Sequence, residues 1–302
     1  MKINELKKVL DEFKDSIKFE HSIKKKNWFN IGGDTKVFYK ANSLKELALF
    51  LKKLNNKEKI FILGAGSNTL MTDNFFDGVV IKLSKNFNNI SLLGEDILIA
   101  GSAVLDKSLS DFAMNNSLSG FEFLSCIPGT IGGGIRMNAG CFGAEFKDIL
   151  VSIQAIDIVG NVKTIPAKDI KFEYRKNNLP DNLIFLSASF KGKKDDIPKI
   201  SDQILKLKTE KEKNQPTKIK TSGSTFKNPI SQTNKKVWEL IKESVPLDKC
   251  FGDAGISEKH CNFFVNKGDA SFKDMTMLID FVAKKVLEKT GISLEKEIKI
   301  LE

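Results

Sequence analysis

Arginine is nearly absent from this sequence. Of its 48 cationic side chains, all but Arg136 and Arg175 are lysines, and tyrosine is as scarce, with 2 residues against 23 phenylalanines. A planar guanidinium binds carboxylate or phosphate through two parallel hydrogen bonds, which an ammonium cannot do. The two remaining arginines are therefore candidates for a functional role, although chance retention of the codon explains them equally well.

Cysteine and histidine are also rare. The 4 cysteines are widely spaced, and the chain has only 2 histidines. No C-x-x-C pair or neighbouring histidine pair of the kind that binds zinc is present. We therefore expect no metal site, and we expect reduced thiols at Cys126, Cys141, Cys250 and Cys261.

Long apolar runs are missing as well. No uninterrupted apolar stretch reaches the length of about 18 residues that a transmembrane helix needs. The segment Met1–Leu10 has an amphipathic helical pattern and lacks the apolar core of a signal peptide. We expect a cytoplasmic protein without membrane insertion.

Acidic residues are outnumbered, which leaves a formal net charge of +10 and a pI of about 9.2. This charge would suit nucleic-acid binding, but the lysines are spread over helical faces and mixed with acidic residues. Neither a recognition helix nor stacked aromatic residues accompany them. We expect no nucleic-acid partner, and a positive field would equally attract a small anionic substrate.

Strand and helix patterns alternate along the 302 residues, which are enough for two domains. Ser43-Leu-Lys-Glu46 is a capping box that predicts a helix to about Leu54, and Gly291 is a C-cap for a helix from about Phe272 to Thr290. Other predicted helices cover 1–10, 109–116, 198–214 and 235–243, and predicted strands cover 60–63, 79–83, 97–104, 151–158, 162–166, 184–190, 261–266 and 293–301.

Two glycine-rich segments stand out. Gly64–Thr69 follows a predicted strand, as a dinucleotide-binding loop does, but Thr69 replaces the third glycine of the Rossmann fingerprint, and no P-loop motif is present. A plain tight turn would look the same. The second segment, Cys126–Gly143, is too apolar for a flexible linker, and ordering its glycines costs entropy. We expect its backbone to contact a ligand.

These two segments and five others form an ordered series of motifs along the chain. The motifs are Asn27-Trp-Phe-Asn-Ile-Gly-Gly33, Leu63-Gly-Ala-Gly-Ser-Asn-Thr-Leu70, the segment from Ile127 to Gly143, Tyr174-Arg175, Gly223-Ser-Thr-Phe-Lys-Asn-Pro229, Gly252-Asp-Ala-Gly-Ile-Ser-Glu-Lys-His260 and Leu294-Glu-Lys-Glu-Ile298. In this order they resemble the motifs of the UDP-N-acetylenolpyruvoylglucosamine reductase family, also called UDP-N-acetylmuramate dehydrogenases. The resemblance spans about Asn27 to the C-terminus and is to the shorter subclass, which lacks an extra tyrosine-bearing substrate loop.

The resemblance implies an α+β fold in two domains. The first is a two-subdomain FAD-binding domain of the p-cresol methylhydroxylase type, expected at 1–195 with subdomains at about 1–85 and 86–195. A C-terminal α+β substrate-binding domain is expected at 196–302. Its last strand, about 293–302, is expected to return Glu297 to the flavin site.

The implied activity is the NADPH-dependent, FAD-mediated reduction of UDP-N-acetylglucosamine enolpyruvate to UDP-N-acetylmuramate, a precursor of peptidoglycan. The partners would be the UDP-sugar and NADPH, and we expect a monomer. The residues that the resemblance assigns to the cofactor are mostly small, so that the backbone can approach it. They are Leu63, Gly64, Ala65, Gly66, Ser67, Asn68, Pro128, Gly129, Thr130, Gly132, Gly133, Asn138, Ala139 and Gly140.

Hydride addition to an enol ether conjugated with a carboxylate builds up negative charge, which needs preorganised cations or hydrogen-bond donors. The resemblance assigns this task to Arg175 and Glu297, and the protonation of the adjacent carbon to Ser224. Without the resemblance, Ser224 would be read as a turn residue and Glu297 as an exposed strand carboxylate. Substrate contacts are implied at Tyr174, Lys227, Asn228 and His260, the last of which could equally be a packed or surface histidine.

Some positions depart from the family pattern. Cys126 stands where glycine is common, and Cys141 replaces a small residue beside the proposed flavin. Two alternatives stay open. Another FAD oxidoreductase of the same fold would share mainly the first half of the chain, and a non-catalytic basic binding protein would share none of the chemistry.

Overall fold

The computed structural model describes residues 1–216 and 219–302. The chain forms two compact units, each built from separate stretches. The first unit contains Met1–His21, Lys36–Ala65 and Asp77–Lys211, and the second contains Ser22–Thr35, Gly66–Phe76 and Glu212–Glu302. This division follows the packing of the chain. The functional domains expected at 1–195 and 196–302 stay a prediction.

The first unit holds two sheets, one of four strands in the order β1-β2-β5-β3 and one of five in the order β12-β11-β15-β7-β6. Strand β3 runs parallel to β5, whereas all neighbours in the five-stranded sheet are antiparallel. The strands are β1 Ile17–Ser22, β2 Asp34–Ala41, β3 Lys59–Ile62, β5 Phe76–Leu83, β6 Ile90–Leu93, β7 Ile97–Gly101, β11 Leu150–Ile156, β12 Val162–Pro166 and β15 Ile184–Lys191.

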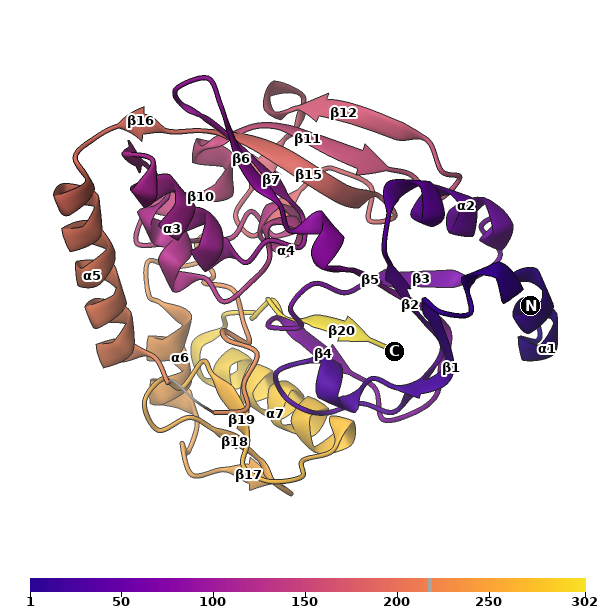
Figure 1. Cartoon of the computed structure of the whole chain (residues 1–302). Coiled ribbons are helices and arrows are strands. Elements are labelled where there is room, and N and C mark those ends of the chain that lie inside the picture. The colour runs from indigo at the N-terminus through magenta and orange to yellow at the C-terminus, as the bar shows by residue number, and fades with distance from the viewer. Residues whose placement is uncertain (217–218) are drawn as a thin grey trace. The chain divides into compact units, whose positions relative to one another are not determined.

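Each sheet carries its own apolar core. Helices α1 (Ile3–Val9) and α2 (Leu44–Leu54) pack on the four-stranded sheet, where the rings of Tyr39 and Phe50 stack with centroids 3.8 Å apart. Helix α2 begins as predicted, because the Ser43 hydroxyl accepts the Glu46 N–H at 3.1 Å. Helices α3 (Asp106–Asn115) and α4 (Ile131–Arg136) pack with the five-stranded sheet (Figure 1). Helix α5 covers Ile197–Asn214.

Helix α4 lies inside the second glycine-rich segment and was not predicted. Ile131 and Ile135, four residues apart and both fully buried, give this short segment an apolar helical face. Gly134 in this helix permits close packing. A Cβ on Gly134 would lie 2.2 Å from a carbon of the Phe146 ring, so no larger residue fits there.

Arg136 supports the fold rather than a ligand. Its guanidinium donates hydrogen bonds to the carbonyl oxygens of Leu179 (3.2 Å), Pro180 (2.9 Å) and Leu183 (2.7 Å). It also lies 4.2 Å from the centre of the Phe185 ring. A planar fork with several N–H groups is suited to this combination, and a lysine is not. These contacts explain why position 136 is an arginine rather than a lysine.

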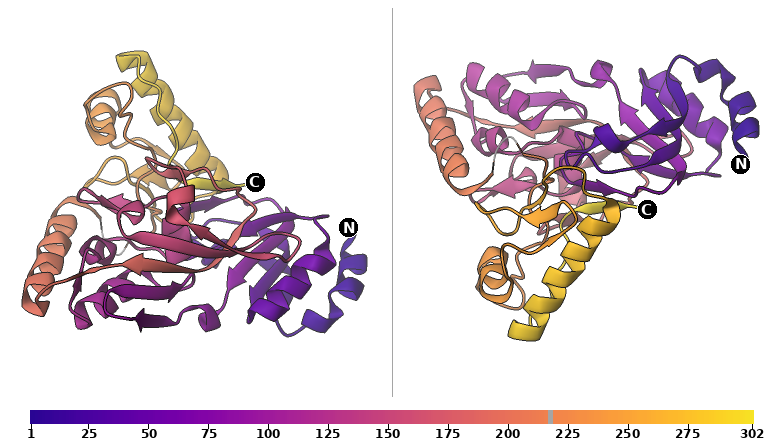
Figure 2. Two further views of the ribbon diagram at one scale, coloured as in Figure 1. Left: turned by 90° about the horizontal axis from the view of Figure 1, so that it is seen from above. Right: turned by 90° about the horizontal axis from the view of Figure 1, so that it is seen from below.

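The second unit combines a small antiparallel sheet with two helices. The sheet has β17 (Cys250–Phe251), β18 (Ala254–Ile256) and β19 (Phe264–Asn266), and the helices are α6 (Val237–Ser244) and α7 (Phe272–Thr290). Helix α7 has its predicted bounds and is continuous in both views of Figure 2. A capping box at Ser271 begins it, and Gly291 at φ 73° ends it.

The chain ends in a strand shorter than predicted. Strand β20 covers only Lys299–Leu301, and it pairs in parallel with β4 (Thr69–Met71). Residues 293–298 precede it without forming a strand of their own. The remaining short strands are β8 Leu118–Ser119, β9 Gly140–Cys141, β10 Ala144–Glu145, β13 Phe172–Glu173, β14 Lys176–Asn177 and β16 Lys193–Lys194.

Three further properties concern membranes, metals and thiols. Over residues 1–216 and 219–302, no helix is long and apolar enough to cross a membrane. The same residues contain no group of three or more histidine, cysteine, aspartate or glutamate side chains that could hold a metal ion. All four cysteines are free thiols, as predicted.

Gly134→Ala should lower the free energy of unfolding by about 1–3 kcal/mol, because the added methyl group overlaps the Phe146 ring. Gly133→Ala in the same helix is the matched control. Its Cβ would meet nothing closer than 3.6 Å, so the change should be neutral or stabilise by up to about 1 kcal/mol. Urea denaturation followed by circular dichroism compares the two. Equal losses of stability would contradict the packing role of Gly134.

Candidate functional site

The two glycine-rich segments approach each other within the first unit. A Cβ on Gly64 would lie 2.7 Å from the Thr130 hydroxyl oxygen, so the absence of a side chain permits this contact. Leu63 donates its N–H to Ile81, and the Gly64 carbonyl accepts a hydrogen bond from the Lys82 ammonium at 3.0 Å. The loop after β3 is therefore fixed beside the start of α4.

The amide groups at the start of α4 are partly used by the protein itself. Thr130 is the N-cap residue in an extended conformation, and the N–H groups of Ile131 and Gly132 donate to the carbonyls of Val104 and Ser102. These two amides hold the segment in place and are not spare donors for a phosphate. Any ligand must be contacted by other backbone groups of the segment.

Several buried polar atoms lie beside this segment without a partner among the described residues. They are the Ser102 hydroxyl and both carboxyl oxygens of Asp106, a residue with no exposed surface. A Cβ on Gly129 would lie 2.5 Å from Asp106 Oδ2, and burial raises the pKa of the Asp106 carboxyl well above its ordinary value. Buried polar groups normally have partners, so the surroundings of Gly129 fit a further polar group. The residues present thus fit a polar cofactor.

Asn138 binds protein groups with its whole side chain. It is fully buried at φ 41°, its amide donates to the Glu145 carboxylate (3.0 Å) and the Glu173 carbonyl (3.1 Å), and its oxygen accepts the Lys147 N–H (3.1 Å). Sequence reasoning placed Asn138 at the cofactor. In the structure its side chain positions the turn that carries Ala139 and Gly140.

Arg175 is held against this turn. Its Nη2 donates to the Gly140 carbonyl at 2.7 Å, its Nη1 lies 3.7 Å from the Glu145 carboxylate, and its guanidinium lies 4.8 Å from the centre of the Tyr174 ring. The backbone of Arg175 has φ 56°, a conformation that non-glycine residues adopt rarely and that is concentrated at functional sites. Arg175 is thus placed beside the second glycine-rich segment.

Within the second unit, the other end of the first glycine-rich loop is tied to Glu297. The Asn68 amide donates to the Glu297 carbonyl at 3.1 Å, and the Asn68 carbonyl accepts the Lys299 N–H at 2.9 Å. Gly66, at φ 71°, approaches Lys26 so closely that a Cβ would lie 2.3 Å from its carbonyl oxygen. In the chain, Ser67 lies between Gly66 and Asn68.

Ser224 is positioned by the backbone on both sides. It forms an isolated antiparallel bridge with Phe263, and its neighbour Thr225 accepts the Glu297 N–H at 2.8 Å. The buried Asn262 amide fixes the segment further by bonding both the N–H and the carbonyl of Phe226, at 3.0 and 2.9 Å. Ser224, Glu297 and Asn68 are therefore brought together within one unit.

The predicted substrate-contacting residues of the second unit have diverse environments. The Lys227 ammonium pairs with Glu295 at 2.5 Å, and the Asn228 oxygen accepts the Val237 N–H at the start of α6. His260 is partly buried, its Nδ1 accepts the Asn262 N–H at 3.3 Å, and its ring packs on Phe263. Burial lowers the pKa of His260, which favours the neutral imidazole at neutral pH.

The predicted residues are divided between the two units. The first unit contains Leu63, Gly64, Ala65, Pro128, Gly129, Thr130, Gly132, Gly133, Asn138, Ala139, Gly140, Tyr174 and Arg175, and the second contains Gly66, Ser67, Asn68, Ser224, Lys227, Asn228, His260 and Glu297. Sequence reasoning missed Asp106, Glu145 and Asn262. No spacing pattern marks them, because each acts through a neighbour that is distant in sequence.

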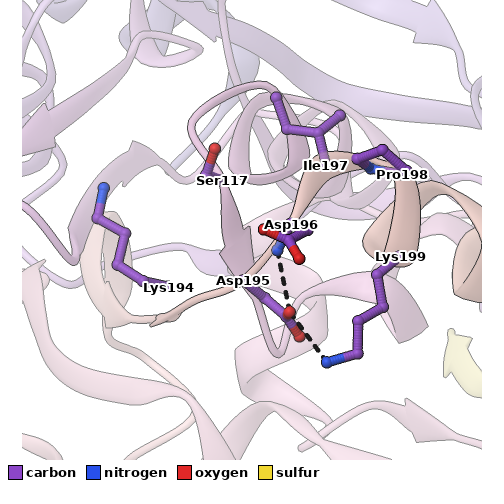
Figure 3. Close-up of a pocket in the computed structure, with 7 residues that line it drawn as sticks. All are labelled: Ser117, Lys194, Asp195, Asp196, Ile197, Pro198 and Lys199. Carbon is purple, nitrogen blue, oxygen red and sulfur yellow. Dashed lines mark hydrogen bonds and ion pairs between the residues drawn. The ribbon is translucent and has the colours of Figure 1, made fainter.

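One surface pocket lies outside both groups. Figure 3 shows its lining, with Asp195 paired to Lys199 at 3.0 Å and accepting the Asp196 N–H. The lining residues are Ser117, Lys194, Asp195, Asp196, Ile197, Pro198 and Lys199. None of them was predicted to bind anything, and the pocket contributes nothing to the site.

Two family models match the chain. Residues 35–165 match the FAD binding domain, and residues 215–301 match the C-terminal domain of UDP-N-acetylenolpyruvoylglucosamine reductase. These matches confirm the predicted fold class, an FAD-binding domain followed by the reductase's C-terminal domain.

Similar proteins cover the chain almost completely. The UDP-N-acetylenolpyruvoylglucosamine reductase of Pelagibacter ubique is 65% identical over 100% of both chains, and that of Rickettsia typhi is 45% identical over 96% of this chain and 97% of its own. The crystal structure of UDP-N-acetylenolpyruvylglucosamine reductase from Thermus caldophilus matches with a TM-score of 0.80 and 28% identity, covering 95% of this chain and 98% of that one. The chain belongs to the UDP-N-acetylenolpyruvoylglucosamine reductase family.

Proposed function

We infer that this protein is an FAD-dependent oxidoreductase that uses NADPH to reduce UDP-N-acetylglucosamine enolpyruvate to UDP-N-acetylmuramate in peptidoglycan precursor synthesis. The observation that carries this conclusion is the full-length identity of 65% to a reductase of that name. The FAD-binding domain match supports FAD as the cofactor and NADPH as the co-substrate. The UDP-sugar is the other small-molecule partner.

We assign the cofactor to the glycine-rich backbone. The close approach of Gly64 and Thr130, together with the unpartnered polar atoms around Gly129, supports this assignment. When bound, FAD would take a hydride from NADPH and supply it to the enol ether. The protein's own part is to hold these loops rigidly, and the side chain of Asn138 does so through its three hydrogen bonds.

Arg175 is proposed to hold the substrate carboxylate and to stabilise the negative charge that develops there. Its guanidinium is oriented beforehand by the Gly140 carbonyl and by Glu145, so little reorganisation is needed when charge appears.

Ser224 and Glu297 are proposed as the proton donor to the substrate carbon and as the carboxyl group beside the developing charge. A serine hydroxyl is a weak acid, so its position must be fixed. The support for this pairing is the hydrogen bond from the Glu297 N–H to Thr225, next to Ser224. Tyr174, Lys227, Asn228 and His260 are proposed substrate contacts. The Glu295 partner of Lys227 offsets part of that lysine's charge.

We also propose that the enzyme works as a monomer in the cytoplasm, with functional domains at 1–195 and 196–302. The nucleotide nature of both substrates supports the location. Light scattering coupled to size exclusion measures the mass in solution against the 33.7 kDa of one chain.

The purified protein should be yellow, with the absorption band of bound flavin. Under anaerobic conditions NADPH should bleach the band, and UDP-N-acetylglucosamine enolpyruvate should restore it. Absorbance spectroscopy measures both half-reactions. A colourless protein that takes up no FAD would favour the non-catalytic basic protein, and bleached flavin that only oxygen restores would favour another oxidoreductase of this fold.

Ser224→Ala should leave the bleaching by NADPH unchanged and slow the recovery with the enolpyruvyl substrate by about 10²–10⁴-fold, because only the second half-reaction needs the proton. Stopped-flow absorbance separates the two rates.

Ser222→Ala is the matched control for this change. The Ser222 hydroxyl donates to the Thr69 carbonyl at 3.2 Å, so its loss should cost about 1 kcal/mol of stability and spare both half-reactions. If Ser224→Ala slows both half-reactions equally, its assigned role is wrong.

A further inference from the structure

One of the chain's two tryptophans lies beside the first glycine-rich loop. Trp28 belongs to the same unit as Gly66, Ser67 and Asn68, and its N–H donates to the Gly66 carbonyl at 3.0 Å. This hydrogen bond places the backbone of Trp28 against residues that we assign to the cofactor. Trp28 itself is not among the residues that the family resemblance assigns to FAD.

The contact between the two segments depends on Gly66. A Cβ on Gly66 would lie 2.3 Å from the Lys26 carbonyl oxygen and 2.7 Å from the Asn27 Cα. Gly66 also has φ 71°, a conformation that glycine adopts readily and other residues rarely do. A side chain at position 66 would therefore force the segment that carries Trp28 away from the loop.

The residues on both sides of Trp28 are anchored in the core of the unit. Asn27 is buried, and its amide donates to the Ile31 carbonyl at 2.7 Å. Phe29 has no exposed surface, and its carbonyl accepts a hydrogen bond from the Asn266 amide at 2.8 Å. The backbone that carries the indole is therefore fixed beside the loop.

The Trp28 side chain is exposed between these buried neighbours, with 44% of its surface accessible. Leaving a large apolar ring in water forgoes free energy that a bound molecule can recover by covering it, and tryptophan is enriched where other molecules bind. Lys24, Lys25 and Lys26 precede it in the chain, with Lys24 paired to Asp269 at 2.7 Å. An exposed indole next to a lysine-rich turn suits a ligand with a planar ring and a negative charge.

We propose that Trp28 is a cofactor-contacting residue, and that its indole stacks on one of the two planar ring systems of FAD, the isoalloxazine or the adenine. FAD carries both rings on a diphosphate, which matches the indole, the lysines and the loop of small residues that lie together here. The inference rests on the proposed assignment of the Gly64–Thr69 loop to FAD.

Hydroxyl-radical footprinting of the full chain, with and without bound FAD, tests the contact. Trypsin cleaves after Lys26, Lys36, Lys236 and Lys242, so Trp28 falls on peptide 27–36 and Trp238 on peptide 237–242.

Trp238 is the internal control for this experiment, because it is similarly exposed, at 41%, and lies on α6, where we assign no cofactor contact. Mass spectrometry of the two peptides gives both oxidation rates in one sample. We expect FAD to slow the oxidation of Trp28 at least about threefold relative to that of Trp238, because a stacked ring covers the indole. If FAD leaves the ratio of the two rates unchanged, the inference is wrong.

Substitutions measure what the contact contributes to FAD binding. Trp28→Ala should raise the Kd for FAD by about 5–150-fold, the loss expected for one stack of a base on an aromatic side chain. Trp28→Phe keeps a ring and should stay within about fivefold of the unchanged protein. Trp238→Ala should not change the Kd. Titration followed by flavin fluorescence gives each Kd, and an unchanged Kd in Trp28→Ala would contradict the proposal.

Further readouts separate the rings and the possible failures. Stacking on the isoalloxazine should make Trp28→Phe shift the visible absorption band of the bound flavin, whereas stacking on the adenine should leave the band in place and change only the Kd. The footprint uses the unchanged chain, so it decides the question even if Trp28→Ala does not fold. A protein that binds no FAD would refute the proposed function, whereas a flavoprotein whose Trp28 stays exposed would refute only this contact.

Discussion

The rest of this structure depends on one constraint. At several glycines the backbone lies so close to neighbouring groups that no side chain would fit. A Cβ at Gly64 would meet Thr130 at 2.7 Å, one at Gly134 would meet Phe146 at 2.2 Å, and one at Gly140 would meet Ala144 at 2.3 Å. The first of these contacts brings together two loops that are far apart in sequence, and the other two pack the second loop against the residues that follow it. The conformational entropy lost by ordering so many glycines is offset by the packing they permit.

Hydrogen bonds from a few buried amide side chains fix the positions of backbone segments that packing alone would leave less well defined. Asn138 holds the turn before Gly140, and Asn262 holds both backbone groups of Phe226 near Ser224. Each amide replaces water with several protein partners, so its removal would leave buried groups unpaired. The residues proposed for chemistry thus depend on others that touch no substrate.

The two arginines of the chain have different physical roles. Arg136, which is partly buried, donates to three backbone carbonyls and lies against the Phe185 ring, a combination of contacts to which a guanidinium is suited. Arg175 is braced by Gly140 and Glu145 in a rare backbone conformation, as a ligand-binding group would be.

Local patterns determined the elements that depend on neighbouring residues. The caps at Ser43 and Gly291 and the bounds of α7 were predictable, because capping is a local interaction. Motif order also indicated the family, the fold class and the cofactor. Helix α4 was not predictable, since its glycines have low helix propensity and only burial of Ile131 and Ile135 stabilises it. The same holds for Asp106 and Asn262, whose roles come from partners distant in sequence and were decided by the tertiary structure alone.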